Sequence, residues 1–295
     1  MIPKILHYIW FGGKPLTPLA EQCLASWKEH MPETANGGEW EYMRWDEASL
    51  AQVLCEPNLN PSLKGRTSKQ LSEQSQEGHS WLDYMPIYVR QAYEARKFAF
   101  VSDYVRLWAL EQYGGVYVDT DVKVLKSYEP LLGDTAFIGL EESLAHLPGT
   151  CVMGCEPHCQ WVKEMLMLYD GAEFIRPDGS LDMMTNVERM GGIMMKELKN
   201  ERMDGLRNEG VCELGKYWKQ IQYINKWELR IYTHDYFSPI TSTRVMRKTK
   251  NTYSIHYFAE SWRDGKRVSG WHNWTITREI VNALVQVKRW LMNKG

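Results

Sequence analysis

The sequence predicts an α/β fold with a mainly parallel sheet flanked by helices. Three observations support this prediction. A strand, a helix and a second strand follow one another at 5–10, 17–30 and 40–47, which is the usual first unit of a parallel sheet. A helical segment at 89–115 runs directly into an apolar strand at 116–118. Further strand-like and helical segments alternate along the rest of the chain, as they do in α/β proteins.

The early elements have local causes. Residues 5–10, ILHYIW, are apolar and are followed by two glycines. The helix 17–30 has Thr17 as a candidate N-cap and Pro18 in its first turn. Its apolar positions recur at helical spacing and are Leu19, Cys23, Leu24 and Trp27. Gly114 and Gly115 end the helical segment that precedes the strand 116–118.

The remaining elements are assigned by pattern. Residues 56–80 are polar, which predicts a loop insertion. We therefore predict one domain, 1–272, followed by an amphipathic C-terminal helix within 273–295. The further expected elements are a helix at 158–170 and strands at 136–140, 150–153, 229–239 and 252–262.

Composition excludes some classes of protein. The net charge of −2 over 295 residues gives no support to nucleic-acid binding through overall charge. The N-terminal residues lack the features of a signal peptide, and no apolar run reaches the roughly 18 residues that a spanning helix needs. We therefore expect a soluble, cytoplasmic protein whose six cysteines stay reduced.

Three cysteines lie close together in the sequence. Cys151, Cys155 and Cys159 are spaced C-x3-C-x3-C, unlike the C-x2-C pairs of zinc sites. Buried thiols without a chemical role are the expected interpretation, and a metal site is the alternative.

Two aspartates end the apolar strand at 116–118. Residues i and i+2 of a strand point to the same side, so Asp119 and Asp121 are expected to converge at the carboxyl edge of the sheet, where α/β proteins bind ligands. Two close carboxylates repel each other unless a cation lies between them. Their oxygen ligands suit Mg²⁺ or Mn²⁺, and such ions leave positions free for a diphosphate.

Two other interpretations of this pair stay open. One is a pair of solvated aspartates in a turn, because turns favour Asp. The other is a phosphatase of the haloacid-dehalogenase type, which also places D-x-D after a strand. That motif continues to Thr or Val where this chain has Lys123, and it usually opens the domain.

Three blocks of the sequence resemble one family. Residues 98–132 (FAFVSDYVRLWALEQYGGVYVDTDVKVLKSYEPLL) resemble the signature block of glycosyltransferase family 32, residues 2–16 its first strand, and residues 252–262 its closing block. The resemblance extends to bacterial capsule and lipopolysaccharide enzymes and, more distantly, to the glucosylating domains of clostridial toxins. It implies a GT-A fold, a divalent metal, a nucleotide-diphosphate sugar donor and retention of configuration. UDP-hexose is the expected donor, with GDP-mannose as the alternative.

The resemblance also implies roles for particular residues. Asp121 would bind the metal, and Asp119 would contact the donor ribose and the metal. Asp103 and Arg106, on one helix face, would bind oxygens of the donor. Asn186 would lie beside the donor sugar, so the predicted catalytic set is Asp119, Asp121, Arg106 and Asn186.

The resemblance assigns the rest of the donor site to its first block, residues 2–16, and its closing block, residues 252–262. Trp10 would stack on the nucleobase, Ile9 and Phe11 would offer backbone groups to its edge, and Gly12 would permit close approach. In the closing block, His256 would complete the metal site, and Ser261 and Trp262 would close over the diphosphate. The family pattern has a second histidine and a glycine where this chain has Tyr257 and Glu260.

The predicted function is transfer of a hexose to a saccharide acceptor in the synthesis of capsule or lipopolysaccharide. The alternatives are the phosphatase and a non-catalytic sugar-binding protein of the same fold. The predicted helix 275–294 carries Arg278, Lys288, Arg289 and Trp290 beside its apolar face. It either packs on its own domain or contacts the inner face of the membrane, where it would meet a lipid-linked acceptor.

Overall fold

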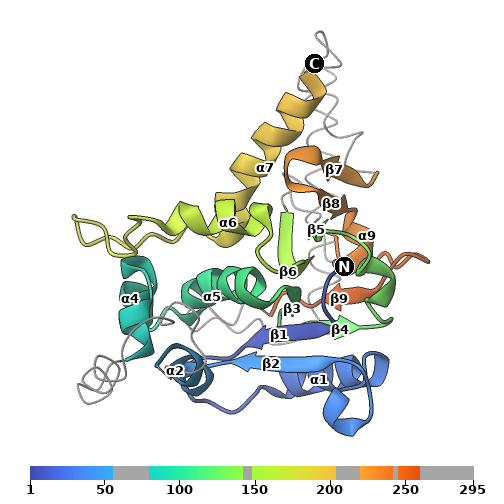
Figure 1. Cartoon of the computed structure of the whole chain (residues 1–295), viewed down its shortest axis with the longest axis horizontal. Coiled ribbons are helices and arrows are strands. Elements are labelled where there is room, and N and C mark those ends of the chain that lie inside the picture. The colour runs from blue at the N-terminus through green and yellow to red at the C-terminus, as the bar shows by residue number, and fades with distance from the viewer. Residues whose placement is uncertain (56–79, 142–147, 204–219, 242–244, 260–295) are drawn as a thin grey trace, which may run out of the picture.

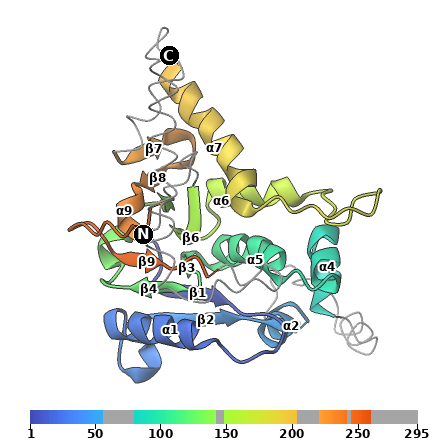
Figure 2. The same ribbon diagram turned by 180° about the vertical axis from the view of Figure 1, so that it is seen from behind.

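A seven-stranded mixed sheet organises the chain, as the computed structural model shows in Figures 1 and 2. The structure describes residues 1–55, 80–141, 148–203, 220–241 and 245–259. Most of the predicted loop insertion, the C-terminal helix, and Ser261 and Trp262 lie outside these residues.

The strand order is β2-β1-β3-β6-β5-β8-β7. Parallel pairs join β2 to β1, β1 to β3 and β5 to β8, whereas β6 and β7 pair antiparallel with their neighbours. Five strands therefore run in one direction, and the predicted α/β class with a mainly parallel sheet is confirmed. The strands of this sheet are β1 (Ile5–Ile9), β2 (Glu41–Trp45), β3 (Gly115–Val118), β5 (Ala136–Leu140), β6 (Pro148–Cys155), β7 (Gln222–Ile224) and β8 (Leu229–Tyr232).

Helices cover both faces of the sheet. The helices are α1 (Pro18–His30), α2 (Glu47–Cys55), α4 (Ile87–Glu94), α5 (Phe98–Tyr113), α6 (Gln160–Leu166), α7 (Asn186–Met203) and α9 (His234–Phe237). Successive residues of a strand pack into two separate hydrophobic cores, one on each face of the sheet. In β3, Val116 and Val118 pack toward α1 and α9, whereas Tyr117 packs toward α5 and α6. This division follows from the two-residue period of a strand.

A second, two-stranded sheet lies on the α1 side. It pairs β4 (Val122–Val124) antiparallel with β9 (Ser254–His256). Two buried hydrogen bonds fix β4 to α1: the indole Nε1 of Trp27 donates to the carbonyl of Val122 at 2.7 Å, and the amide of Val124 donates to Ser26 Oγ at 3.0 Å. The segment that follows the two aspartates is therefore held from this face.

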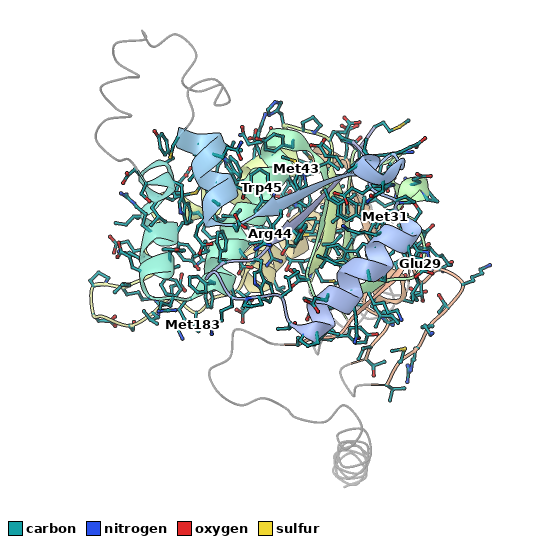
Figure 3. All side chains as sticks on the ribbon, turned by 90° about the horizontal axis from the view of Figure 1, so that it is seen from below. Glu29, Met31, Met43, Arg44, Trp45 and Met183 are labelled. Atoms are coloured by element: carbon teal, nitrogen blue, oxygen red, sulfur yellow. The ribbon has the colours of Figure 1, made fainter. Side chains whose placement is uncertain are left out.

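Figure 3 views the molecule from the side of α1 and β2. Met31 follows α1, and Met43, Arg44 and Trp45 lie on β2. Trp45 is buried and donates its indole N–H to Nδ1 of the buried His7 at 3.0 Å. Because a ring nitrogen of His7 also lies 2.7 Å from the carbonyl oxygen of Gly114, the strands β1 and β2 are connected to the end of α5.

The helical segment 89–115 is not one helix. Arg96 has a φ of +57°, in the left-handed region, and separates α4 from α5. The amide of Lys97 donates to the carbonyl of Ala92 at 2.8 Å, which caps the end of α4. This local break was missed because the apolar pattern continues across it.

Other predicted elements also differ from the structure. The strand expected at 229–239 ends at Tyr232 and is followed by α9. Within 252–259, the described part of the strand expected at 252–262, the extended residues are Ser254–His256. The helices α2 and α7 were not predicted. The predicted N-cap of α1 is confirmed, because Thr17 Oγ1 accepts a hydrogen bond from the amide of Ala20 at 3.2 Å. Among the described helices, none has both the length and the apolar character needed to cross a bilayer.

We expect Gly114→Ala to destabilise the fold. Gly114 has a φ of +63°, and a Cβ there would lie 2.6 Å from the backbone nitrogen of Pro157. With ψ at −154°, this backbone conformation is one that glycine alone adopts readily, and it costs a residue with a Cβ about 1–3 kcal/mol. The matched control is Gly133→Ala, where a Cβ meets nothing within 4 Å. In urea unfolding, the midpoint concentration of Gly114→Ala should be lower than that of the wild type, whereas that of Gly133→Ala should be unchanged. Equal midpoints for the two variants would contradict the strain at Gly114.

Candidate active site at the carboxyl edge of the sheet

The two aspartates lie in a tight turn between β3 and β4. The amide of Val122 donates to the carbonyl of Asp119 at 3.0 Å and closes this turn. The sequence-based geometry was therefore wrong in one respect: the pair does not continue the strand, which ends at Val118. The turn still brings the carboxylates together, at the edge where the parallel strands β1 and β3 end.

A histidine completes this group. Oxygens of Asp119 and Asp121 and a ring nitrogen of His256 all lie within 4.8 Å of one another. His256 Nε2 is 3.4 Å from Asp121 Oδ1, because the β4–β9 pairing sets His256 opposite Val122. The amide of Ala259 donates to Asp121 Oδ2 at 2.8 Å. The predicted association of His256 with the two aspartates is thus present in the structure.

The pKa shifts describe how charge is balanced here. Burial acts to raise the pKa of Asp121, but the charge of His256 together with hydrogen bonds from His256 and the amide of Ala259 outweighs it, so the net shift is downward. Burial likewise acts to lower the pKa of His256, but its interactions with Asp121 and Cys151 together turn the net shift strongly upward. Burial raises the pKa of Asp119 despite the nearby Arg106. The two carboxylates therefore need positive charge nearby, and a protonated His256 or a bound cation could supply it.

Arg106 links the aspartates to the rest of the site. Its guanidinium lies 3.1 Å from Asp103 and 3.4 Å from Asp119, and only 8% of its side chain is exposed. It also donates to the carbonyl and the hydroxyl of Thr150 at 3.1 and 3.3 Å, and lies 4.6 Å above the ring centre of Tyr117. Asp103 and Arg106, which were predicted to bind oxygens of the donor, thus form an ion pair with each other, and this pair is buried. Their contact with the donor stays a prediction.

Asn186 joins the same group through Asp103. The amide of Asn186 donates to Asp103 Oδ2 at 2.9 Å, and its side-chain NH₂ donates to the Asp103 carbonyl at 3.1 Å. Burial raises the pKa of Asp103 to about 6, although Arg106 opposes the shift. The side-chain oxygen of Asn186 is buried and has no hydrogen-bond partner among the described residues. Its hydrogen-bonding capacity is therefore unused within the described residues.

The end of β1 reaches the same edge of the sheet. Trp10 is half-buried and donates its indole N–H to the carbonyl of Lys14 at 2.6 Å. Phe11 is instead a core residue whose ring stacks on Trp81 at 5.8 Å, and Ile9 is buried as well. The side chains of Ile9 and Phe11 therefore belong to the core, and contact of their backbone groups with a nucleobase stays a prediction.

Gly12 is required by close packing. Its φ is +89°, and a Cβ would lie 2.6 Å from the ring of Phe98. Its amide donates to Glu47 Oε1 at 2.8 Å. The glycine therefore permits a close approach of protein to protein at this point, whereas the prediction assigned its space to the nucleotide.

The structure adds residues that the sequence analysis missed. The hydroxyl of Tyr117 donates to Asp119 Oδ1 at 2.6 Å. Its position two residues before Asp119 was a usable signal, because such residues share a face of the strand. Thr150 on β6 and Glu141 after β5 gave no signal, since their proximity depends on the order of strands in the sheet.

The three neighbouring cysteines do not converge on one site. Cys151 packs in the core on the α1 side of the sheet, whereas Cys155 and Cys159 pack on the α5 side. Among the described residues, the cysteine that joins a group of possible metal ligands is Cys151, with Glu141 and His256. The expectation of buried thiols is confirmed for all three, and a common C-x3-C-x3-C metal site is excluded.

Comparison with known proteins finds a family match in the N-terminal half of the chain. Residues 19–138 match the family described as "Glycosyltransferase sugar-binding region containing DXD motif". The matched segment includes Asp103, Arg106, Asp119 and Asp121. The match is to a sugar-transferase region, so the phosphatase interpretation of the two aspartates is set aside.

One curated relative and several solved structures are similar. Inositol phosphoceramide mannosyltransferase 1 of Schizosaccharomyces pombe is 26% identical over 137 residues, which cover 46% of this chain and 33% of that protein. The chain thus matches about a third of the length of this relative. PaToxG glycosyltransferase is 16% identical with a TM-score of 0.45, covering 68% of this chain and 71% of its own. The galactosyltransferase LgtC is 14% identical with a TM-score of 0.31, covering 93% and 95%.

We expect Tyr117→Phe to weaken metal binding. Loss of the hydroxyl leaves Asp119 held by Arg106 alone, and residues that orient metal ligands are typically worth 10–100-fold in metal affinity. Titration with Mn²⁺ should show affinity reduced about 10-fold or more. The control is Tyr113→Phe, since Tyr113 stacks on Trp45 at 5.6 Å, away from the carboxylates. Equal affinities of Tyr117→Phe and wild type would mean that Asp119 needs no such support.

Proposed function

We propose that the protein is a metal-dependent, retaining glycosyltransferase of the GT-A fold that moves a hexose from a nucleotide-diphosphate sugar to a saccharide acceptor. One observation carries the proposal: two carboxylates and an imidazole meet beside a buried arginine at the carboxyl edge of the sheet, within the region that matches the sugar-transferase family. A solvated pair of turn aspartates would need no such surroundings.

The ligand set fits a divalent cation. Asp121 and His256, with Asp119, would hold Mn²⁺ or Mg²⁺, because carboxylates suit these ions and the imidazole favours Mn²⁺ among them. When bound, the ion would neutralise the diphosphate and so assist its departure as a leaving group. Ala259 and Tyr257 hold Asp121 from the backbone, since their amides donate to its carboxylate and its carbonyl, respectively.

The arginine cluster would orient the donor. Arg106 is already fully engaged with Asp103, Asp119 and Thr150, so its role is to hold both carboxylates rigid and to supply fixed positive charge near the diphosphate. Asp103 and Asp119 would accept hydrogen bonds from hydroxyls of the sugar and the ribose. Asn186, with its unpaired buried oxygen, would accept another. Rigid acceptors lower the cost of fixing a flexible sugar.

The nucleobase would lie on Trp10 at the end of β1. The half-buried indole is anchored through its N–H to Lys14, which fixes the ring plane for stacking. Ser261 and Trp262, outside the described residues, remain candidates for closing over the diphosphate. UDP-hexose is the proposed donor and GDP-mannose the alternative; the latter is supported by the name of the related mannosyltransferase.

Retention would follow a front-face route. Retaining glycosidases use two carboxyl groups about 5 Å apart, one as the nucleophile and one as the acid and base. Here Asp119 and Asp121 face each other across the proposed metal position, so neither is free to attack the sugar. The leaving phosphate would then take the proton of the acceptor hydroxyl as that oxygen bonds to the sugar carbon.

We assign the acceptor to surface polysaccharide synthesis, as capsule or lipopolysaccharide, in the cytoplasm. A lipid-linked saccharide is compatible with the related protein, whose name specifies a ceramide lipid. The tail 275–294, outside the described residues, is our candidate for contact with the inner face of the membrane.

Loss of the metal ligand should abolish activity. We expect Asp121→Asn to reduce donor hydrolysis and sugar transfer by at least about 100-fold, the scale of losing a key electrostatic group at a reacting centre. Excess EDTA should do the same to the wild type, with recovery on addition of Mn²⁺. The exposed Asp178→Asn is the matched control. Full transfer in EDTA, or wild-type rates in a folded Asp121→Asn, would refute the metal mechanism.

Trp10 should report on the nucleotide. We expect UDP or GDP to quench tryptophan fluorescence in the wild type and clearly less in Trp10→Phe, with affinity reduced about 5–150-fold because stacking is worth roughly 1–3 kcal/mol. Trp108→Phe is the control, since Trp108 packs edge-on against Trp45. Unchanged quenching and affinity in Trp10→Phe would place the base elsewhere.

A further inference from the structure

We propose that Glu141, Cys151 and His256 form a second cation site, which takes a thiophilic divalent ion, Zn²⁺, and that its occupation withdraws His256 from the aspartate pair. Binding at this site does not depend on the enzymatic activity. Its consequence for Mn²⁺ binding rests on the proposed function of Asp119, Asp121 and His256.

The three side chains converge from three elements. Glu141 follows β5, Cys151 lies on β6 and His256 ends β9, yet one ligand atom from each lies within 4.8 Å of the other two. The backbone makes room for this meeting. A Cβ on Gly149 would lie 2.7 Å from Cγ of Glu141, so the absence of a side chain at Gly149 lets the glutamate stem turn inward.

A buried ring nitrogen of His256 faces this group without a regular hydrogen bond. His256 Nδ1 lies 3.3 Å from Glu141 Oε1 but makes no hydrogen bond of acceptable geometry with any described residue. Buried polar atoms are almost always paired, and an unpaired one commonly marks a place for an ion or water. The other ring nitrogen, Nε2, faces Asp121 at 3.4 Å.

The ligand atoms of this second group favour a different metal ion from the one that the aspartate pair favours. A thiolate, an imidazole and a carboxylate are the ligands that Zn²⁺ takes in proteins, with a water in the fourth position. The aspartate pair offers mainly carboxylate oxygens, which suit Mn²⁺ and Mg²⁺. On binding, a Zn–S bond would form, the Cys151 thiol proton would pass to solvent, and the ion would shed bound water.

The two sites would exclude each other through one imidazole. A neutral imidazole has a lone pair on one nitrogen and a hydrogen on the other. If Nδ1 binds Zn²⁺, the hydrogen must lie on Nε2, which then donates toward Asp121 and cannot bind Mn²⁺. If Nε2 binds Mn²⁺, the hydrogen lies on Nδ1 and points to Glu141. Zn²⁺ would thus act as an inhibitor that does not occupy the Mn²⁺ position.

The binding test uses Co²⁺ in place of Zn²⁺ on the full-length protein. Thiolate ligation of Co²⁺ produces an intense near-ultraviolet charge-transfer band that oxygen and nitrogen ligands do not give. We expect this band in the wild type and in Cys155→Ser, a matched buried thiol on the same strand, and its loss in Cys151→Ser. No band in the wild type, or a persistent band in a folded Cys151→Ser, would overturn the proposed site.

The exclusion test measures Mn²⁺ binding directly by electron paramagnetic resonance, so it needs no active enzyme. We expect stoichiometric Zn²⁺ to weaken Mn²⁺ binding at least 10-fold in the wild type and in Cys155→Ser, with little effect in Cys151→Ser. Equal displacement in Cys151→Ser would mean that Zn²⁺ simply replaces Mn²⁺ at the aspartates, which refutes the exclusion. Failure of Mn²⁺ to bind any variant would instead count against the proposed function, and the Co²⁺ result would still stand.

Discussion

The ion pairs of Arg106 with Asp103 and Asp119 are the interaction on which the site depends. A buried guanidinium is costly unless its charge and its N–H groups are satisfied. Here one arginine from α5 meets a carboxylate from its own helix, a carboxylate that follows β3 and the carbonyl of Thr150 on β6. Through Asp103 it also reaches the start of α7. Four elements therefore share one buried charge cluster, and the position of Asp119 is set by it.

The opposite face of the sheet fixes the rest of the aspartate turn. Trp27 and Ser26 of α1 bind the backbone of β4, and β4 in turn pairs with β9, which carries His256. Asp119 is thus held from the α5 side and Asp121 from the α1 side. The turn that carries the two aspartates lies between these two groups of contacts. Asp119 is therefore held mainly by Arg106, and Asp121 mainly by His256.

Sequence reasoning succeeded where the signal was local. The Thr17 cap, the glycines after α5 and the three-residue spacing of Asp103 and Arg106 are all properties of short segments. Sequence reasoning failed for elements and residues whose positions depend on tertiary packing. The helix α7 contains two adjacent glycines, which lower helix propensity, and it forms because Met190, Met194 and Leu198 pack into the core. Thr150 and Glu141 reach the site only because β6 lies between β3 and β5, an order that no local pattern specifies.

His256 is the residue at which these constraints converge. It belongs to a strand of three residues whose position depends on β4, and its two ring nitrogens face ligands of different character. A histidine aimed by a carboxylate on one side is the usual way in which proteins present the other nitrogen to a metal. Under the proposed exclusion, Glu141 would orient the imidazole when the aspartates hold the cation and would become a ligand when Cys151 does. The choice between these two states would then depend on which ring nitrogen of His256 carries the hydrogen.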